Sequence, residues 1–218
     1  MSNAEFSALS QSIIDGDLDT TLEKVQHSLD SGVTPQVIME GHLIPAMGEV
    51  GRLFEEGEYF VPELMISARA MQSAMKILNP LLSGSGVKKI GRVVIGTVKG
   101  DFHDIGKNLV AAMLEGGGFE VVDLGVDVSP EKFAEAAQQQ TGTVVAMSAL
   151  LTTTMPQMKN VIEKLEAEGL RGTSKVMIGG APVTEEFAKK IGADGYSDNA
   201  SAAVTLAKSF FASAFPSP

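Results

Sequence analysis

The sequence contains no cysteine, only three histidines and fewer basic than acidic residues. The lack of cysteine excludes a disulfide scaffold, thiolate metal sites and cysteine nucleophiles. With 17 Lys and Arg against 27 Asp and Glu, the formal net charge is −10. Because a basic face is needed to bind phosphates, this balance argues against a nucleic-acid partner, and we expect the charge to aid solubility instead.

Long apolar runs are also missing. No stretch approaches the roughly 18 to 20 residues that a membrane-spanning helix needs, and the N-terminal sequence MSNAEFSALSQ lacks the basic end and apolar core of a signal peptide. We therefore predict no membrane association and a cytoplasmic location. The 218 residues, 44% of them hydrophobic, are enough for one large core or two modest ones.

The first part of the chain has a helical pattern. In PELMISARAMQSAMKILNPLL, apolar residues recur at alternating spacings of four and three from Leu64 to Leu82, which predicts a core-facing helix. Weaker stripes predict three more helices, over residues 5–15, 18–31 and 34–54. The expected helix ends carry two candidate N-caps and three glycines, namely Asp17, Thr34, Gly16, Gly32 and Gly57. This pattern indicates a small antiparallel bundle.

In the second part of the chain, the apolar residues follow a different spacing. Composition changes at LLSGSGVKKIGRVV, so we place a domain boundary between residues 86 and 87. Short apolar or β-branched segments then alternate with helical stretches of roughly 10 to 15 residues, and these segments are RVVIGTV, EVVDLGV, TVVAMSAL, KVMIGG and ADGYSD. We therefore expect a helical bundle over residues 1–86 and an α/β domain over 87–218, with a flavodoxin-like (Rossmann-like) five-stranded parallel sheet covered on both faces.

Polar and small residues gather at the ends of three of these strands. In a doubly wound sheet, ligands bind beyond the carboxyl ends of the strands where the strand order reverses, which is here beside the first and third strands. The residues at these ends supply an imidazole, carboxylates, hydroxyls and glycine backbone, and they are Asp101, His103, Ser148, Thr152, Thr154, Gly179 and Gly180. This mixture suits a large, partly polar cofactor better than a small metabolite.

Each of these residues also has an ordinary structural interpretation. A histidine beside two aspartates at a strand end is often a capping or hydrogen-bonding residue rather than a metal ligand. The threonine run at 152–154 could cap a helix, Gly106 could serve a turn, and a glycine pair such as Gly179–Gly180 is common after a strand. We expect His27 and His42 at the surface or between helices of the bundle, although His42 could face a bound cofactor.

Three motifs together point to a known family. GDFHDIG carries a D-x-H-x-x-G pattern, and with SALLTTTM and IGG it resembles the cobalamin-binding fold shared by methionine synthase and the corrinoid proteins of methyl-transfer systems. The segment GRLFEEGEYFVPELMISARAM is similar to the helical cap that precedes this domain in those proteins. The resemblance covers nearly the whole chain, and the three motifs with the cap are specific.

The resemblance implies how cobalamin binds. In the family the benzimidazole base of the cofactor is displaced, and a histidine that corresponds to His103 coordinates the cobalt from the lower face. Asp101 matches the carboxylate that orients this imidazole, and Thr154 takes the place of a serine of methionine synthase in the same hydrogen-bonded relay. Further cofactor contacts are expected from the same two loops, at Gly100, Phe102, Asp104, Ile105 and Leu150.

The resemblance also implies contacts with the nucleotide tail and the upper face of the cofactor. The displaced tail is expected in a slot where Gly106, Gly179 and Gly180 leave room. Ser148 and Thr152 match positions that hydrogen-bond the tail, and Ala200 matches another contact. In the cap, Phe54 and Val61 match a Phe and a Leu that cover the upper face of the corrin, so valine shortens this lid slightly. Glu40 falls near a cap position that contacts the corrin.

The family chemistry implies a methyl carrier rather than a complete enzyme. Cob(I)alamin would take a methyl group from a donor held by a substrate-specific methyltransferase and become methylcobalamin. A second methyltransferase would pass the methyl group to tetrahydrofolate or to a thiol such as coenzyme M, and a reductive activase is a further expected partner. His103 should release cobalt during this cycle, with proton uptake by the relay, and the cap must move. No catalytic barrel fits within this chain.

Three other functions remain open alternatives. A cobalamin sensor would need a DNA-binding module, which the sequence lacks. The small subunit of a cobalamin-dependent mutase shares the histidine motif but normally lacks the helical cap. A response-regulator-like receiver would need a phosphoacceptor aspartate after the third strand, where MSALLTTT has none.

Overall fold

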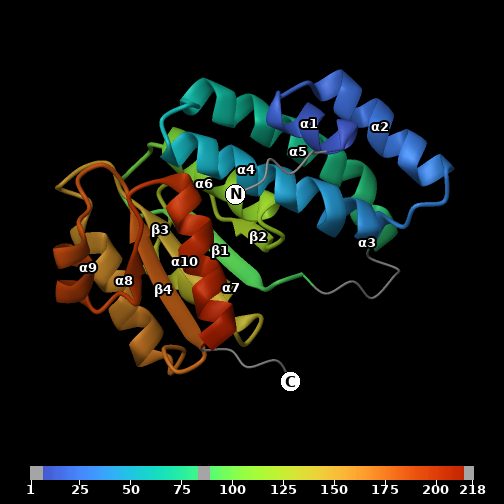
Figure 1. The fold of residues 1–218 in the computed structure, drawn as a ribbon. Coiled ribbons are helices and arrows are strands. Elements are labelled where there is room, and N and C mark those ends of the chain that lie inside the picture. Colours follow the sequence, from blue (N-terminus) through green and yellow to red (C-terminus); the bar gives the residue numbers. More distant parts are fainter. Residues whose placement is uncertain (1–6, 83–88, 214–218) are drawn as a thin grey trace. The chain divides into compact units, whose positions relative to one another are not determined.

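The computed structural model describes residues 7–82 and 89–213 (Figure 1). The chain divides into two compact units, one of residues 1–88 with 115–118 and one of residues 89–114 with 119–218. The predicted boundary between residues 86 and 87 lies outside the described residues. No helix within the described ranges combines the length and the apolar character that crossing a bilayer requires.

The first unit is a helical bundle in which the predicted caps Asp17 and Thr34 start two helices, whereas the first helix begins at Ala8, after its N-cap Ser7, and not at residue 5. Asp17 and Thr34 are N-caps, and their side chains accept hydrogen bonds from the backbone N–H groups of Thr20 and Val37. The predicted stripe along the last helix is buried from Leu64 to Leu82. The elements of this unit are α1 (Ala8–Ile14), α2 (Leu18–Asp30), α3 (Pro35–Ile38), η1 (Met39–Leu43), α4 (Ile44–Glu55) and α5 (Val61–Leu82).

The third predicted helix contains one wide turn, η1, which joins α3 to α4. Proline has no N–H group, so Pro45 cannot donate the regular helical hydrogen bond to the carbonyl group four residues earlier. The N–H group of Ile44 instead donates to the carbonyl oxygen of Met39, five residues earlier, and this bond defines a π-turn. The predicted helical segment over residues 34–54 is therefore present, and this turn, which contains Glu40 and His42, interrupts its α-helical hydrogen bonding.

The second unit is built on five strands that pair in parallel in the order β2-β1-β3-β4-β5. The predicted flavodoxin-like sheet is confirmed, and the strand order reverses between β1 and β3. The strands are β1 (Arg92–Thr97), β2 (Glu120–Asp123), β3 (Thr143–Ser148), β4 (Ser174–Gly179) and β5 (Gly195–Tyr196).

Helices cover both faces of this sheet (Figure 1). Val145 and Met147 of β3 belong to one apolar cluster with α7 (Pro130–Gln138), α8 (Pro156–Ala167) and α9 (Glu185–Ile191). The alternate residues of β3 belong to a second cluster with residues of α6 (Ile105–Gly116) and α10 (Ala200–Ser213). Burial on both faces explains why the strands read as nearly continuous apolar runs.

Candidate cofactor site

Two loops meet at the point where the strand order reverses. Thr97 at the end of β1 is paired with Ser148 at the end of β3, and the N–H group of Val98 donates to the carbonyl oxygen of Ser148 over 3.0 Å. The loop after β1 carries Asp101 and His103, and the loop after β3 carries Thr154. Parallel pairing therefore brings Thr154 to Asp101, although 53 residues separate them in the sequence.

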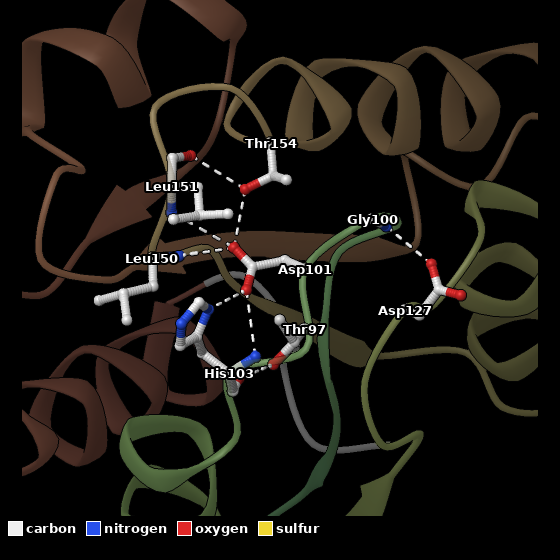
Figure 2. A network of polar contacts seen from close by, with 8 residues as sticks. All are labelled: Thr97, Gly100, Asp101, His103, Asp127, Leu150, Leu151 and Thr154. Carbon is white, nitrogen blue, oxygen red and sulfur yellow. Dashed lines mark hydrogen bonds and ion pairs between the residues drawn. The ribbon is translucent and has the colours of Figure 1, made fainter.

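The carboxylate of Asp101 lies at the centre of this meeting point (Figure 2). It is fully buried and accepts hydrogen bonds at both oxygens. Oδ1 lies 2.7 Å from Nδ1 of His103 and 3.1 Å from the backbone nitrogen of the same residue. Oδ2 accepts from Thr154 Oγ1 over 2.7 Å and from the backbone nitrogens of Leu150 and Leu151 over 2.8 and 3.3 Å.

This environment keeps Asp101 ionised. Burial by itself raises the pKa of the carboxyl group, but the hydrogen bonds from Thr154, His103 and the Leu150 backbone outweigh it and hold the pKa well below its ordinary value. An ionised carboxylate can only accept hydrogen bonds, so Nδ1 of His103 carries the hydrogen between the two groups. In the neutral imidazole ring, Nε2 then keeps its lone pair and is available as a ligand.

The surroundings of His103 are apolar and exposed. The side chain of His103 is 51% exposed. Four large apolar side chains of the two loops and the start of α6 are also exposed to solvent, namely Phe102, Ile105, Leu150 and Leu151. Exposed apolar groups around a ligating nitrogen suit a broad ligand with an apolar face. Leu151 was not among the predicted contacts, although the pair of leucines in SALLTTTM could have indicated it.

A metal ion at Nε2 would have to bring most of its own ligands. Across residues 7–82 and 89–213, no group of three or more His, Cys, Asp or Glu side chains is placed to hold a metal ion. A single imidazole beside an apolar surface therefore fits a metal held in a macrocycle, and it does not fit a bare ion with a full set of protein ligands. The residues present are thus compatible with cobalamin.

The interpretation of the threonine run as a helix cap was wrong. Helix α8 follows Met155 and has no side-chain cap hydrogen bond. The hydroxyl group of Thr154 instead contacts Asp101 Oδ2 and also lies 2.9 Å from the carbonyl oxygen of Leu151. Thr152 is exposed, and its expected role toward the nucleotide tail stays a prediction.

The predicted slot glycines differ in what surrounds them. At Gly106, in the first turn of α6, an added Cβ atom would meet nothing within 4 Å. At Gly179 it would lie 3.0 Å from the carbonyl oxygen of Ser197. Gly180 has a φ of +127°, and an added Cβ atom would lie 2.0 Å from the carbonyl oxygen of Ala149. The fold itself therefore requires glycine at position 180, whereas position 106 is open.

The remaining predicted contacts lie outside the two loops. Ser148 is half-buried at the end of β3, and Ala200 is buried at the start of α10. In the bundle, Phe54 is half-buried, Val61 is 43% exposed and Glu40 is exposed. Their roles toward a cofactor stay predictions.

The two histidines of the bundle differ in exposure, and some of its large apolar side chains are exposed. His27 is exposed, as predicted. His42 is half-buried, and its Nδ1 lies 2.9 Å from the hydroxyl group of Ser7. Beside Val61, Phe60 and Met65 are 65% and 51% exposed, and the sequence interpretation did not single them out.

The chain matches known proteins over most of its length. Two family models, each described as a B12 binding domain, match residues 91–205 and 6–79. A dimethylamine corrinoid protein of Methanosarcina acetivorans is 48% identical over 192 residues, which are 88% of each chain.

Solved structures give the same picture. The methanol:cobalamin methyltransferase complex MtaBC from Methanosarcina barkeri contains a chain that matches with a TM-score of 0.83 and 33% identity, over 94% of this chain and 79% of that one. A cobalamin-binding protein from Desulfitobacterium hafniense matches with a TM-score of 0.77 and 33% identity, over 95% and 99% of the two chains.

Proposed function

Because this chain belongs to the family of B12-binding corrinoid proteins, we propose that it carries a methyl group between a substrate-specific methyltransferase and a second methyltransferase. When bound, cobalamin supplies a cobalt centre that accepts and donates the methyl group. One observation supports the proposal most directly. The buried carboxylate of Asp101 fixes the ring of half-exposed His103 and leaves Nε2 as the available ligand.

In this proposal, Nε2 of His103 would hold the cobalt of the cofactor in place of its benzimidazole base. The Nδ1 contact with Asp101 fixes the tautomer and the direction of the ring, and a carboxylate in this place makes the imidazole a stronger donor. Phe102, Ile105 and Leu150 contribute an apolar surface from which water is excluded beneath the corrin. The proposed slot for the displaced tail would be lined by Gly106, Gly179, Gly180, Ser148, Thr152 and Ala200.

The hydrogen-bond relay could adapt to a change in the charge of His103. Nε2 of the ring can take a proton, and the ionised carboxylate of Asp101 stabilises the imidazolium that results. The hydroxyl group of Thr154 has a single hydrogen and two acceptors within reach, Asp101 Oδ2 at 2.7 Å and the carbonyl oxygen of Leu151 at 2.9 Å. It can therefore keep donating to Asp101 or turn to Leu151 as the charge of the relay changes.

The relatives support a methylated amine as the methyl donor. The relative of 48% identity is a dimethylamine corrinoid protein, and a methanol system lies at 33% identity. Tetrahydrofolate or a thiol is the proposed methyl acceptor. A reductive activase is a further proposed partner. We propose that the protein acts in the cytoplasm. Residues 1–86 are proposed to act as the cap, with Phe54, Val61 and Glu40 as its contacts to the upper face of the corrin, and residues 87–218 as the cofactor domain.

The ligation is tested by loading the protein with hydroxocobalamin and recording the visible spectrum. The wild-type spectrum should show histidine in place of benzimidazole, and His103→Ala should lose this signature, with free imidazole restoring it. His27→Ala, an exposed histidine of the bundle, is the matched control and should behave as the wild type. A His103→Ala spectrum identical to the wild-type spectrum would exclude the assigned ligand.

Methyl carriage is tested on the same loaded protein. After reduction under anaerobic conditions, it is mixed with a dimethylamine methyltransferase and dimethylamine, and the methylated cofactor is measured by its absorbance. We expect one methyl group per bound cofactor. A wild-type protein that binds corrinoid but stays unmethylated with methylamine and methanol methyltransferases and their substrates would contradict the carrier function.

A further inference from the structure

We propose that Asp127 is a positioning residue for the cobalt ligand, because it holds the backbone beside Asp101 from the neighbouring loop. This inference rests on the proposed function, since it concerns the ligation by His103. Asp127 lies between β2 and α7, outside the motifs that indicated the site, and it touches neither the imidazole of His103 nor the carboxylate of Asp101 through its side chain.

Asp127 makes two hydrogen bonds to consecutive residues of the motif loop, the segment 98–104 after β1, and Figure 2 shows the one from Gly100 to its side chain. Its side-chain oxygen Oδ1 accepts from the N–H group of Gly100 over 2.7 Å. Its own N–H group donates to the carbonyl oxygen of Asp101 over 2.9 Å. The side chain and the backbone of one residue thus hold the segment that carries Asp101 at two points.

The backbone of Asp127 indicates that this side chain is needed. Its φ is +53°, and among residues 7–82 and 89–213 it is the one non-glycine residue with a positive φ. L-residues avoid this region because Cβ crowds the backbone, and glycine adopts it without that penalty. Gly125, two residues earlier, shows that this loop uses glycine at another left-handed position. Residues kept in such conformations are concentrated at functional sites.

The hydrogen bonds of Asp127 add to others that fix the motif loop from the neighbouring strands. From the β3 side, the Asp101 carboxylate is held by the backbone of Leu150 and Leu151. From β1, the hydroxyl group of Thr97 donates to the carbonyl oxygen of His103 over 2.8 Å. From the loop after β2, Asp127 adds its hydrogen bonds to Gly100 and Asp101. If the Gly100–Asp101 segment turned, the carboxylate would leave its donors, and the ring of His103 would turn with it.

The exposure of Asp127 makes the inference testable. Asp127 is exposed, whereas Asp101 is fully buried, so substitutions at position 127 leave the core intact. Asp127→Gly keeps the favoured backbone conformation and the bond from its own N–H group, and it removes only the acceptor for Gly100. Asp127→Asn keeps an acceptor oxygen and tolerates a positive φ, so it is the matched conservative variant.

The experiment measures how much cobalt is ligated by histidine in each full-length, corrinoid-loaded variant, from the visible spectrum and from competition by free imidazole. We expect Asp127→Gly to lower the equilibrium constant for His103 ligation about tenfold, the factor that losing one charge-assisted hydrogen bond typically brings. Asp127→Asn should change it less than twofold. A merely structural role would lower the stability of the apo-protein without moving the spectrum of the loaded one.

Each outcome decides a separate question. If Asp127→Gly folds, as judged by circular dichroism, and ligates cobalt as the wild type does, the positioning role is wrong. If Asp127→Asn lowers His103 ligation as much as Asp127→Gly does, or if Asp127→Gly does not fold, the hydrogen bond to Gly100 does not position the cobalt ligand. The inference is then also wrong. A wild-type protein without histidine ligation would instead overturn the proposed function itself.

Discussion

At the scale of single residues, Asp101 combines full burial with a negative charge. A buried charge is costly unless several donors surround it, and the hydrogen bonds to its two oxygens, from a hydroxyl, an imidazole and backbone N–H groups, meet that requirement. The same donors hold the pKa of Asp101 below its ordinary value, although burial alone would raise it. The charge that orients His103 therefore depends on this set of donors.

Thr154 provides the test of this dependence. Thr154→Val removes the hydroxyl donor to Asp101 Oδ2 and leaves a buried carboxylate less well satisfied. We expect the free energy of unfolding of the apo-protein at neutral pH to fall by about 1 to 3 kcal/mol, as for other buried groups that lose a partner. Urea unfolding followed by circular dichroism measures the change.

The matched variant is Thr154→Ser, which keeps the hydroxyl group and loses one methyl group. It should cost clearly less than the valine variant. If valine were tolerated as well as serine, the hydroxyl contact with Asp101 would contribute nothing to stability, and the relay would lose its third member.

At the scale of elements, two glycines of the predicted slot serve different purposes. Gly180 follows β4, and the fold requires it because any side chain there would overlap the carbonyl group of Ala149. Gly106 lies in the first turn of α6, where nothing within 4 Å would obstruct a methyl group and where the backbone has no positive φ. Helices disfavour glycine, so its presence at position 106 has no explanation within the described fold.

Gly106→Ala separates folding from binding. Because alanine is the better helix former, we expect the apo-protein to become more stable by roughly 0.5 to 1 kcal/mol. If the nucleotide tail passes this position, the same variant should retain less hydroxocobalamin after gel filtration than the wild type. Thermal unfolding and the bound corrinoid per protein are the two measurements.

Gly180→Ala is the contrasting variant. It should destabilise the apo-protein, because the added methyl group meets backbone atoms in a left-handed conformation. A Gly106→Ala protein that gains stability and still binds corrinoid as tightly as the wild type would show that the tail does not pass position 106.

At the scale of the whole molecule, the relay lies entirely within the second of the two units. A ligand that binds only the folded state stabilises it by mass action. With free hydroxocobalamin at 100 times its dissociation constant, the stabilisation is about 2.7 kcal/mol. We therefore expect the transition of the second unit to rise by roughly 5 to 10 °C in a thermal scan.

His103→Ala is the control for this shift. It removes the proposed metal ligand and keeps the rest of the pocket, so its shift should be smaller at the same corrinoid concentration. A wild-type thermal transition that does not move with corrinoid would contradict binding to the folded unit.

Local sequence patterns were enough to predict much of the fold. The alternation of strand and helix periods predicted the five-stranded parallel sheet, and the caps at Asp17 and Thr34 predicted the starts of two helices. These features depend on residues close together in the chain. The wide turn before Pro45 was missed because a single proline is compatible with either a regular helix start or a π-turn.

The sequence by itself determined which residue types stand at the strand ends and, through its motifs, which family the chain resembles. Only the tertiary structure decided that five donors converge on Asp101 and that Asp127 holds the backbone beside it. The physical reason is that these contacts join loops after three different strands. Their distances depend on strand pairing and backbone angles, which no local pattern encodes.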